Sequence, residues 1–174
     1  VSNGAAIWEG TVAQPKGATE LDRVADITSV PVISGRVICA VAFQGRVACF
    51  ELGGSGTQTW ARDMSSAVGL TIEGRTLYVT DDKGAVHALD VASGASLWKQ
   101  DKLLRRQVSA PVVLRGWVVV ADVEGVVHFL RRDDGAFAAR LKTDGSPVLA
   151  SPRLQGSSVI LQTRDGGVFA IEAE

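Results

Sequence analysis

The sequence has no excess charge of either sign and no long apolar run. Its 18 basic and 19 acidic residues nearly cancel, so charge gives no reason to expect nucleic acid or an anionic membrane as a partner. The longest apolar run, residues 37–43, is far shorter than the roughly 20 residues of a membrane-spanning helix. The N-terminus lacks a basic region followed by an apolar stretch, so we expect any export signal or lipid anchor to lie upstream or to have been removed.

What the sequence does contain is a repeat of about 40 residues. Four segments share an order of apolar stretch, glycine turn, apolar stretch, glycine turn and a further apolar stretch. The second glycine of this order recurs at positions 45, 84, 125 and 166, in steps of 39, 41 and 41. Such a period is typical of propellers or helical arrays. No segment shows a sustained helical period, so helical arrays are disfavoured.

The stretches between the glycines read as β-strands because they are rich in Val, Ile, Leu and aromatic residues. Residues 77–80 and 85–89 flank a turn that ends in Gly84, which is the pattern of a hairpin whose glycine supplies a positive φ. The predicted fold class is all-β: a β-propeller with about four blades, each a four-stranded antiparallel sheet. The predicted partial propeller covers residues 1–174, with repeats at about 29–64, 65–102, 108–144 and 149–174 and a long blade-connecting loop at 10–28.

A tryptophan stands four residues after a glycine in successive units. The pairs are Gly4 and Trp8, Gly56 and Trp60, and Gly94 and Trp98, whereas the third unit has Gly135 and Ala139. A large ring at the same place in each unit fits a wedge between neighbouring sheets, where burial of one ring is worth roughly 2 to 3 kcal/mol. We therefore expect Trp8, Trp60 and Trp98 to dock the blades. The alternative, unrelated core tryptophans, does not explain why the glycine spacing repeats with them.

Residues that commonly carry catalysis are scarce. The two histidines, His87 and His128, occupy the same repeat position, so they belong to different blades and we expect packed or half-exposed side chains rather than a catalytic or metal-binding pair. The serines have no partner base in a recognisable elbow motif. Four aspartates fall in turns without the ligand spacing of a calcium loop: Asp81, Asp82, Asp133 and Asp134. The sequence predicts no catalytic, cofactor-binding or metal-binding residues.

The two cysteines lie symmetrically about one predicted turn. Cys39 and Cys49 flank Gln44 and Gly45, so the hairpin register could place them directly opposite each other. An oxidising compartment would permit a disulfide there. The sequence slightly favours the alternative, in which both are small buried thiols that pack as apolar side chains.

Several segments resemble known families. Residues 88–98 resemble the repeat shared by pyrroloquinoline-quinone (PQQ) dehydrogenases and by the BamB family, and the segment around residues 20–26 is specific to BamB. The BamB resemblance is carried by residues 17–27 followed by Pro31 and Val32, by 101–106 with 109–112, and by 120–128. It covers essentially the whole chain. Quinoprotein dehydrogenases of similar repeat carry adjacent cysteines and a calcium-binding carboxylate set, and this sequence has no adjacent cysteine pair.

The resemblance implies half of an eight-bladed propeller, tethered as a lipoprotein to the periplasmic face of the outer membrane through an anchor outside this chain. It implies a non-catalytic scaffold that needs no cofactor, binds the POTRA domains of BamA, and assists the delivery and insertion of outer-membrane proteins. Unfolded outer-membrane strands that pair with sheet edges are a further expected partner, as is a second copy of the half-propeller. The alternative is a fragment of a PQQ-dependent quinoprotein dehydrogenase.

The loop at residues 10–28 is the predicted contact with the partner. More than twenty residues separate Trp8 from Pro31, where other blade connections have about ten, and loops that long are usually functional or disordered. The resemblance implies that this loop is one of two that touch BamA, the other lying upstream of Val1. An acidic pair is typical of this loop in the family. This chain keeps Asp26 but has Thr28 where the second acid is often found. The predicted contact residues are Glu20, Leu21, Asp22, Arg23, Asp26 and Thr28. The alternative is a solvated loop that only joins blades.

Overall fold

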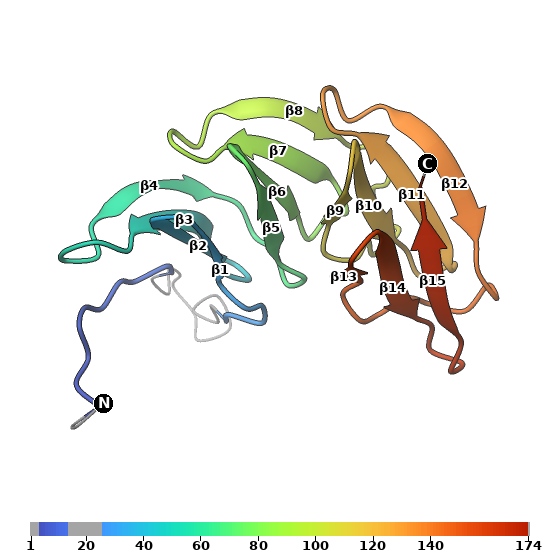
Figure 1. Ribbon diagram of the computed structural model, residues 1–174, viewed down its shortest axis with the longest axis horizontal. Coiled ribbons are helices and arrows are strands. Elements are labelled where there is room, and N and C mark those ends of the chain that lie inside the picture. The colour runs from blue at the N-terminus through green and yellow to red at the C-terminus, as the bar shows by residue number, and fades with distance from the viewer. Residues whose placement is uncertain (1–3, 14–25, 174) are drawn as a thin grey trace.

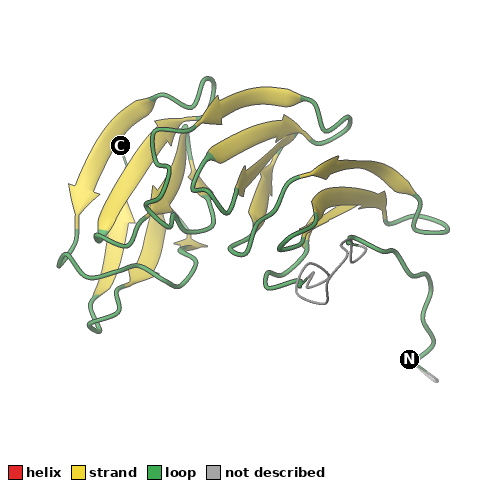
Figure 2. Ribbon diagram, turned by 180° about the vertical axis from the view of Figure 1, so that it is seen from behind, coloured by secondary structure: helices red, strands yellow, loops and turns green. Residues whose placement is uncertain are grey.

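The computed structural model describes residues 4–13 and 26–173, which form strands joined by turns and short connections (Figure 1). Figure 2, in which strands are yellow, shows no helix in this part of the chain. The described residues accordingly contain no helix long and apolar enough to cross a membrane. Their strands form four antiparallel sheets, as the repeat predicts.

Each sheet is a meander of strands that follow one another in the sequence. The first sheet contains β1 (Val32–Ser34), β2 (Val37–Val41), β3 (Arg46–Glu51) and β4 (Gln58–Asp63). The second contains β5 (Leu70–Glu73), β6 (Thr76–Thr80), β7 (Val86–Asp90) and β8 (Ser96–Gln100). The third contains β9 (Val112–Leu114), β10 (Trp117–Ala121), β11 (Val126–Arg131) and β12 (Phe137–Lys142). The fourth contains β13 (Arg153–Gln155), β14 (Ser158–Gln162) and β15 (Val168–Glu172), so it has three strands within the described residues rather than the predicted four.

The sheets stand side by side along an arc (Figure 1). The first strands of the sheets, β1, β5, β9 and β13, are neighbours on the inner side of the arc. The last strands of the first three sheets, β4, β8 and β12, lie on its outer side. This radial arrangement of small sheets is that of propeller blades and differs from the two stacked layers of a sandwich. The predicted propeller class is confirmed.

Apolar cores fill the spaces between neighbouring sheets. Alternate residues of a strand point to opposite faces of its sheet, so β2 directs Cys39 and Val41 into a core shared with the second sheet. Its other face directs Ala40 into a separate cluster with Val12 and Phe50. The segment before the first sheet therefore packs on the face that points away from the second sheet.

Positive backbone φ angles mark the central hairpin turns. Gly84, Gly125 and Gly166 have φ of 92°, 69° and 97° in the second, third and fourth sheets, a conformation that glycine adopts without a Cβ clash. In the first sheet the residue with positive φ is Gln44, at 49°, and not the adjacent Gly45. A Cβ on Gly45 would lie 2.8 Å from the Cβ of Ala42 and 3.0 Å from the Cβ of Ala13, so this glycine allows close packing both within the turn and against the preceding segment.

Cys39 and Cys49 form a disulfide. They are paired residues of β2 and β3 with their Cα atoms 4.1 Å apart, so the predicted opposite register is confirmed. The favoured alternative of two free thiols was wrong. Directly opposed cysteines in an antiparallel pair point to the same face, and both side chains are fully buried there, which brings the two sulfurs together.

Candidate partner-contact site

Two of the six predicted contact residues lie in the described part of the chain. Asp26 and Thr28 are exposed and follow directly after residues 14–25. Glu20, Leu21, Asp22 and Arg23 fall within 14–25 and so lie outside the described residues. The geometry of the site is therefore built from what surrounds Asp26 and Thr28.

The backbone of Asp26 is fixed on the turn of the β2–β3 hairpin. The N–H of Phe43 donates to the Asp26 carbonyl at 2.7 Å, and the Asp26 N–H donates to the Phe43 carbonyl at 3.4 Å. These two bonds form an isolated antiparallel bridge. An exposed carboxylate is thus carried on a backbone held by a hairpin of the first sheet.

Thr28 is fixed to a different connection. Its Oγ1 hydroxyl donates to the carbonyl of Ala67 at 2.5 Å, in the segment between β4 and β5. An ionised acid at this position could not donate that hydrogen bond, because a carboxylate only accepts. Thr28 therefore attaches the chain beside Asp26 to the β4–β5 connection, and it adds no negative charge there.

The segment on the other side of residues 14–25 is held by Arg46. Its Nε donates to the Val12 carbonyl at 2.7 Å and its Nη2 to the Thr11 carbonyl at 3.2 Å. Arg46 is the first residue of β3, on the turn that also carries Phe43. Both ends of the long connection are therefore fastened to the same hairpin turn.

The tryptophans join each unit to the glycine turn of the next. The ring of Trp60 lies on Gly94, where an added Cβ would come within 2.6 Å of the ring, and its Nε1–H donates to the Val91 carbonyl at 2.7 Å. Trp98 contacts Gly135 in the same way and donates to the Arg132 carbonyl at 2.7 Å, and the ring of Trp8 lies on Gly56. Each glycine leaves room for a ring of the preceding unit, which is why the two residue types recur together.

The third unit has no ring at this position. Ala139 lies beside a pocket of about 370 Å³ between the third and fourth sheets. Apolar side chains from both sheets line it, among them Trp117, Phe129, Leu141 and Ile171. The third unit therefore has an alanine where the earlier units place a ring on the glycine turn of the next sheet.

A buried cluster around Asp122 was missed by the sequence analysis. The Asp122 carboxylate is fully buried and accepts from His128 Nε2 at 2.7 Å and from Arg106 Nε at 2.6 Å. It also accepts from the backbone N–H groups of Glu124 and Val126. Burial alone would raise the pKa of Asp122, but these donors outweigh it and lower the pKa to about 2. These contacts hold the β10–β11 turn to the connection before the third sheet, which carries Arg106.

The second sheet has a related pair. His87 Nε2 lies 2.9 Å from Asp81 Oδ2, and Asp81 Oδ1 accepts from the N–H groups of Lys83 and Ala85. Burial lowers the pKa of His87, with the hydrogen bond to Asp81 acting against it. Aspartate six residues before histidine, present in two units, was the available sequence signal. Both histidines are packed on separate sheets, as predicted.

No metal site follows from these pairs. In residues 4–13 and 26–173, no group of three or more His, Cys, Asp or Glu side chains is placed to hold a metal ion. Each histidine faces the aspartate of its own hairpin turn, and the turn amides occupy the other oxygen of that aspartate. The pairs therefore stabilise hairpins.

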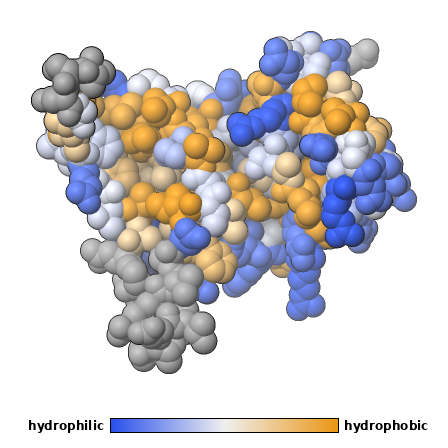
Figure 3. All heavy atoms as spheres, turned by 90° about the horizontal axis from the view of Figure 1, so that it is seen from below, coloured by the Kyte–Doolittle hydropathy of each residue, from blue (hydrophilic) through white to orange (hydrophobic). Residues whose placement is uncertain are grey.

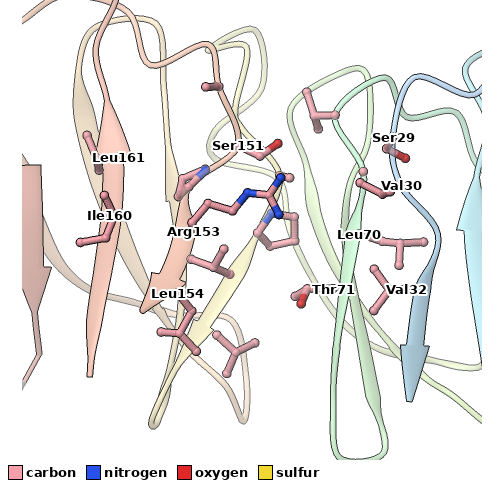
Figure 4. A pocket seen from close by; sticks show the side chains of 18 of the residues that line it. Ser29, Val30, Val32, Leu70, Thr71, Ser151, Arg153, Leu154, Ile160 and Leu161 are labelled. Carbon is pink, nitrogen blue, oxygen red and sulfur yellow. The ribbon is translucent and has the colours of Figure 1, made fainter. Parts of the chain in front are cut away.

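A cleft of about 880 Å³ lies on the inner side of the arc, between the first strands of the sheets. Figure 4 shows Val32 and Leu70 on one side, Leu154 and Ile160 on the other, and Arg153 extending between them. Figure 3, which views the molecule from below, shows apolar side chains gathered along this side. Several large apolar residues that line it are exposed, among them Val30, Leu154 and Val168. Sequence reasoning missed the cleft because it forms only when separate sheets stand together.

Radial sheets, tryptophans seated on glycines of the next unit, and a connection fastened to one hairpin define a partial β-propeller of tryptophan-docked repeats. A family model described as outer membrane protein assembly factor BamB matches residues 1–100. The chain belongs to the BamB family. BamB of Bordetella pertussis is 43% identical over 166 residues, which are 95% of this chain and 43% of that protein. The chain thus spans less than half the length of this relative.

Solved structures agree with the fold. BamB from Moraxella catarrhalis superposes with a TM-score of 0.87 at 26% identity, over 93% of this chain and 48% of that one. A quinohemoprotein alcohol dehydrogenase from Comamonas testosteroni reaches a TM-score of 0.66 at 14% identity, over 84% of this chain and 33% of that one. At that identity the second similarity concerns the fold alone. It gives no support to the dehydrogenase alternative.

Proposed function

We propose that this chain is part of a scaffold of the outer-membrane protein assembly machinery and that the connection before its first sheet binds the POTRA domains of BamA. The scaffold acts at the periplasmic face of the outer membrane, held by a lipid anchor outside this chain, and assists delivery and insertion of outer-membrane proteins. Membership of the BamB family supports this assignment. The observation that carries the contact site is the exposed Asp26 fixed by its backbone to Phe43.

A fixed backbone suits this role because binding costs less when the contact residue is already ordered. Asp26 and Thr28 are tied to two different parts of the propeller, the β2–β3 turn and the β4–β5 connection. An exposed carboxylate between these ties favours a partner surface with a basic residue, because complementary charge guides encounter and orientation. The apolar Ile27 between them, which is also exposed, offers a small anchor.

The scaffold role is favoured over an enzymatic one by the state of the titratable groups. His87 and His128 are buried with the aspartates of their own turns, on different sheets. Neither lies at the exposed connection that distinguishes this sequence from a plain propeller. We propose no reaction and no cofactor for this chain.

The test is isothermal titration of the chain against purified POTRA domains of BamA from the same source. Asp26→Arg reverses the exposed charge without touching the backbone bridge, and we expect it to weaken binding by about tenfold or more. Asp133→Arg is the matched control, since Asp133 is an exposed acid in the β11–β12 turn. Equal affinities for all three proteins would overturn the contact site, and absence of binding by the unmodified chain would overturn the proposed function.

Two further partners belong to this proposal. Unfolded outer-membrane strands could add to outer sheet edges such as β12, whose residues are largely exposed. A second copy could cover the apolar faces at the ends of the arc. Light scattering over a range of concentrations tests the second idea, and a monomer at every concentration would contradict it.

A further inference from the structure

The β2–β3 turn is where three separate segments meet. Arg46 holds the carbonyls of Thr11 and Val12, and the backbone of Phe43 bridges Asp26. The segment after β4 docks on the same turn, because the N–H of Ser66 donates to the Ala42 carbonyl at 3.2 Å and the N–H of Gln44 donates to Ser65 Oγ at 2.7 Å. The β10–β11 turn also contacts the connections on both sides of it, but the segment held at the β2–β3 turn is the one that carries the exposed Asp26.

The hairpin that carries this turn is cross-linked close to it. Cys39 and Cys49 form a disulfide two residue pairs before the last pair of the hairpin, Val41 with Val47. The sulfurs face the core shared with the second sheet and both cysteines are fully buried. Their position keeps the two strands together just below the turn, on the side away from the segment that holds Val12. The disulfide therefore cross-links the two strands within the core.

We infer that the disulfide-linked β2–β3 hairpin is a mount that positions the contact residue Asp26, with Arg46 and the Cys39–Cys49 bond as its positioning elements. This inference rests on the proposed function only in taking Asp26 as a residue that contacts the partner. Asp26 and Thr11 are far apart in sequence, and the mount fixes the place of both relative to the first sheet. Loss of Arg46 or of the disulfide should release Asp26 from the β2–β3 turn and leave the other sheets folded.

Arg46→Met tests the mount without breaking the hairpin, because it keeps an apolar stem and removes the donors to Thr11 and Val12. Arg46→Lys keeps one charged donor and should give partial rescue. Arg36→Met is the matched control, since Arg36 is an exposed arginine of the same sheet whose side chain pairs with Glu51 and does not touch the contact segment.

The first readout needs no partner. The amide of Phe43 is protected by its bond to the Asp26 carbonyl, so its hydrogen exchange reports release of Asp26 from the turn. We expect Arg46→Met, and separately Cys39→Ala/Cys49→Ala, to speed exchange of this amide by about tenfold or more, while amides of the β10–β11 pair stay unchanged. The cysteine variant also removes a constraint on the whole chain, and the unchanged β10–β11 amides separate local release from general unfolding.

The second readout is affinity for the POTRA domains. We expect Arg46→Met to weaken binding by about fivefold to tenfold, Arg46→Lys by less, and Arg36→Met not at all. Unchanged Phe43 exchange in both Arg46→Met and the cysteine variant would overturn the mount, whatever the partner does. If the unmodified chain binds, and Arg46→Met speeds exchange of the Phe43 amide without weakening binding, then Arg46 has no role in positioning the contact residue. If the unmodified chain does not bind, the proposed function fails, and the exchange result still decides whether the hairpin holds Asp26.

Discussion

The central hairpins of the first and third sheets occupy the same place in the repeat and are locked by different chemistry. In the third sheet a buried carboxylate, Asp122, binds His128 and the incoming Arg106. In the first sheet the positions equivalent to Asp122 and His128 hold Ala42 and Ala48, and the strands are joined by a disulfide instead. Where the first sheet has Cys39 and Cys49, the third pairs Val119 with Phe129.

The difference shows what each hairpin must do. Both turns receive the connection from the preceding unit, the third through the side chain of Arg106 and the first through Arg46 and the backbone of Phe43. In the third sheet the carboxylate that makes this contact is fully buried, whereas the arginine is partly exposed. The first sheet has a covalent lock in its core, so its turn can hold a connection with an exposed acid, Asp26. Its disulfide lies in the core, and the acid carried by the connection lies at the surface.

The largest expected effect in this comparison comes from Asp122→Ala. Removal of the carboxylate leaves the buried His128 and two turn amides without their acceptor, while the partly exposed Arg106 keeps only Glu124, and we expect a loss of about 3 to 5 kcal/mol in the free energy of unfolding. Urea unfolding measures it. Asp134→Ala, which removes an exposed pair with Arg131, is the control and should leave stability unchanged within error. A small effect of Asp122→Ala would mean that the ionic lock is dispensable.

The disulfide of the first sheet should contribute somewhat less. Cys39→Ala/Cys49→Ala frees a short loop, since the two cysteines are 10 residues apart, and we expect a loss of about 2 to 3 kcal/mol. Unfolding of both proteins with and without reductant measures the difference. Mass spectrometry of the unreduced, denatured chain should count no free thiol, and a count of two would contradict the covalent lock.

Acid should weaken the third sheet through the same carboxylate. The pKa of Asp122 is lowered from 3.8 to about 2 in the folded chain, so its contribution is complete above its unfolded pKa and is lost as the pH falls from about 3.8 to about 2. The shift corresponds to on the order of 2 kcal/mol. Unfolding of the native chain and of Asp122→Ala across this range tests it. Parallel pH curves would contradict the assignment.

The smallest expected effect concerns His87 of the second sheet. Burial lowers its pKa from 6.5, so the unfolded chain binds the proton more readily and stability decreases as the pH falls below about 6.5. His87→Gln should remove this dependence. Thermal unfolding of the two proteins at mildly acidic and neutral pH checks the sign, and a native chain that gains stability from acidification through His87 would refute it.

The fold could be predicted because its signals are local. Recurring glycines such as Gly84 and Gly125 adopt the left-handed conformation that their turns require, and a tryptophan such as Trp60 meets the glycine of the next unit. Both signals lie within one period of the repeat. The opposite register of Cys39 and Cys49 followed from their equal distances to one turn.

The rest of the site depends on contacts between distant segments. Arg106 belongs to a connection, and nothing in its neighbours predicts that it reaches Asp122, 16 residues later, inside the next hairpin. The donors that Arg46 supplies to Thr11 and Val12 join residues 35 and 34 positions apart. Free energies of such contacts depend on burial, which a repeat pattern does not encode. The choice between thiols and disulfide at Cys39 and Cys49 likewise needed the positions of the sulfur atoms.

Because every sheet is a meander of consecutive strands, its pairings join residues that are near one another along the chain. Each blade can therefore form with little loss of loop entropy and afterwards add to its neighbour. Stability in such a linear array is close to a sum of terms for single units and for their contacts. A destabilising change in one unit, such as loss of the Trp60 ring that rests on Gly94, should then loosen one junction of the array and leave the more distant units cooperative.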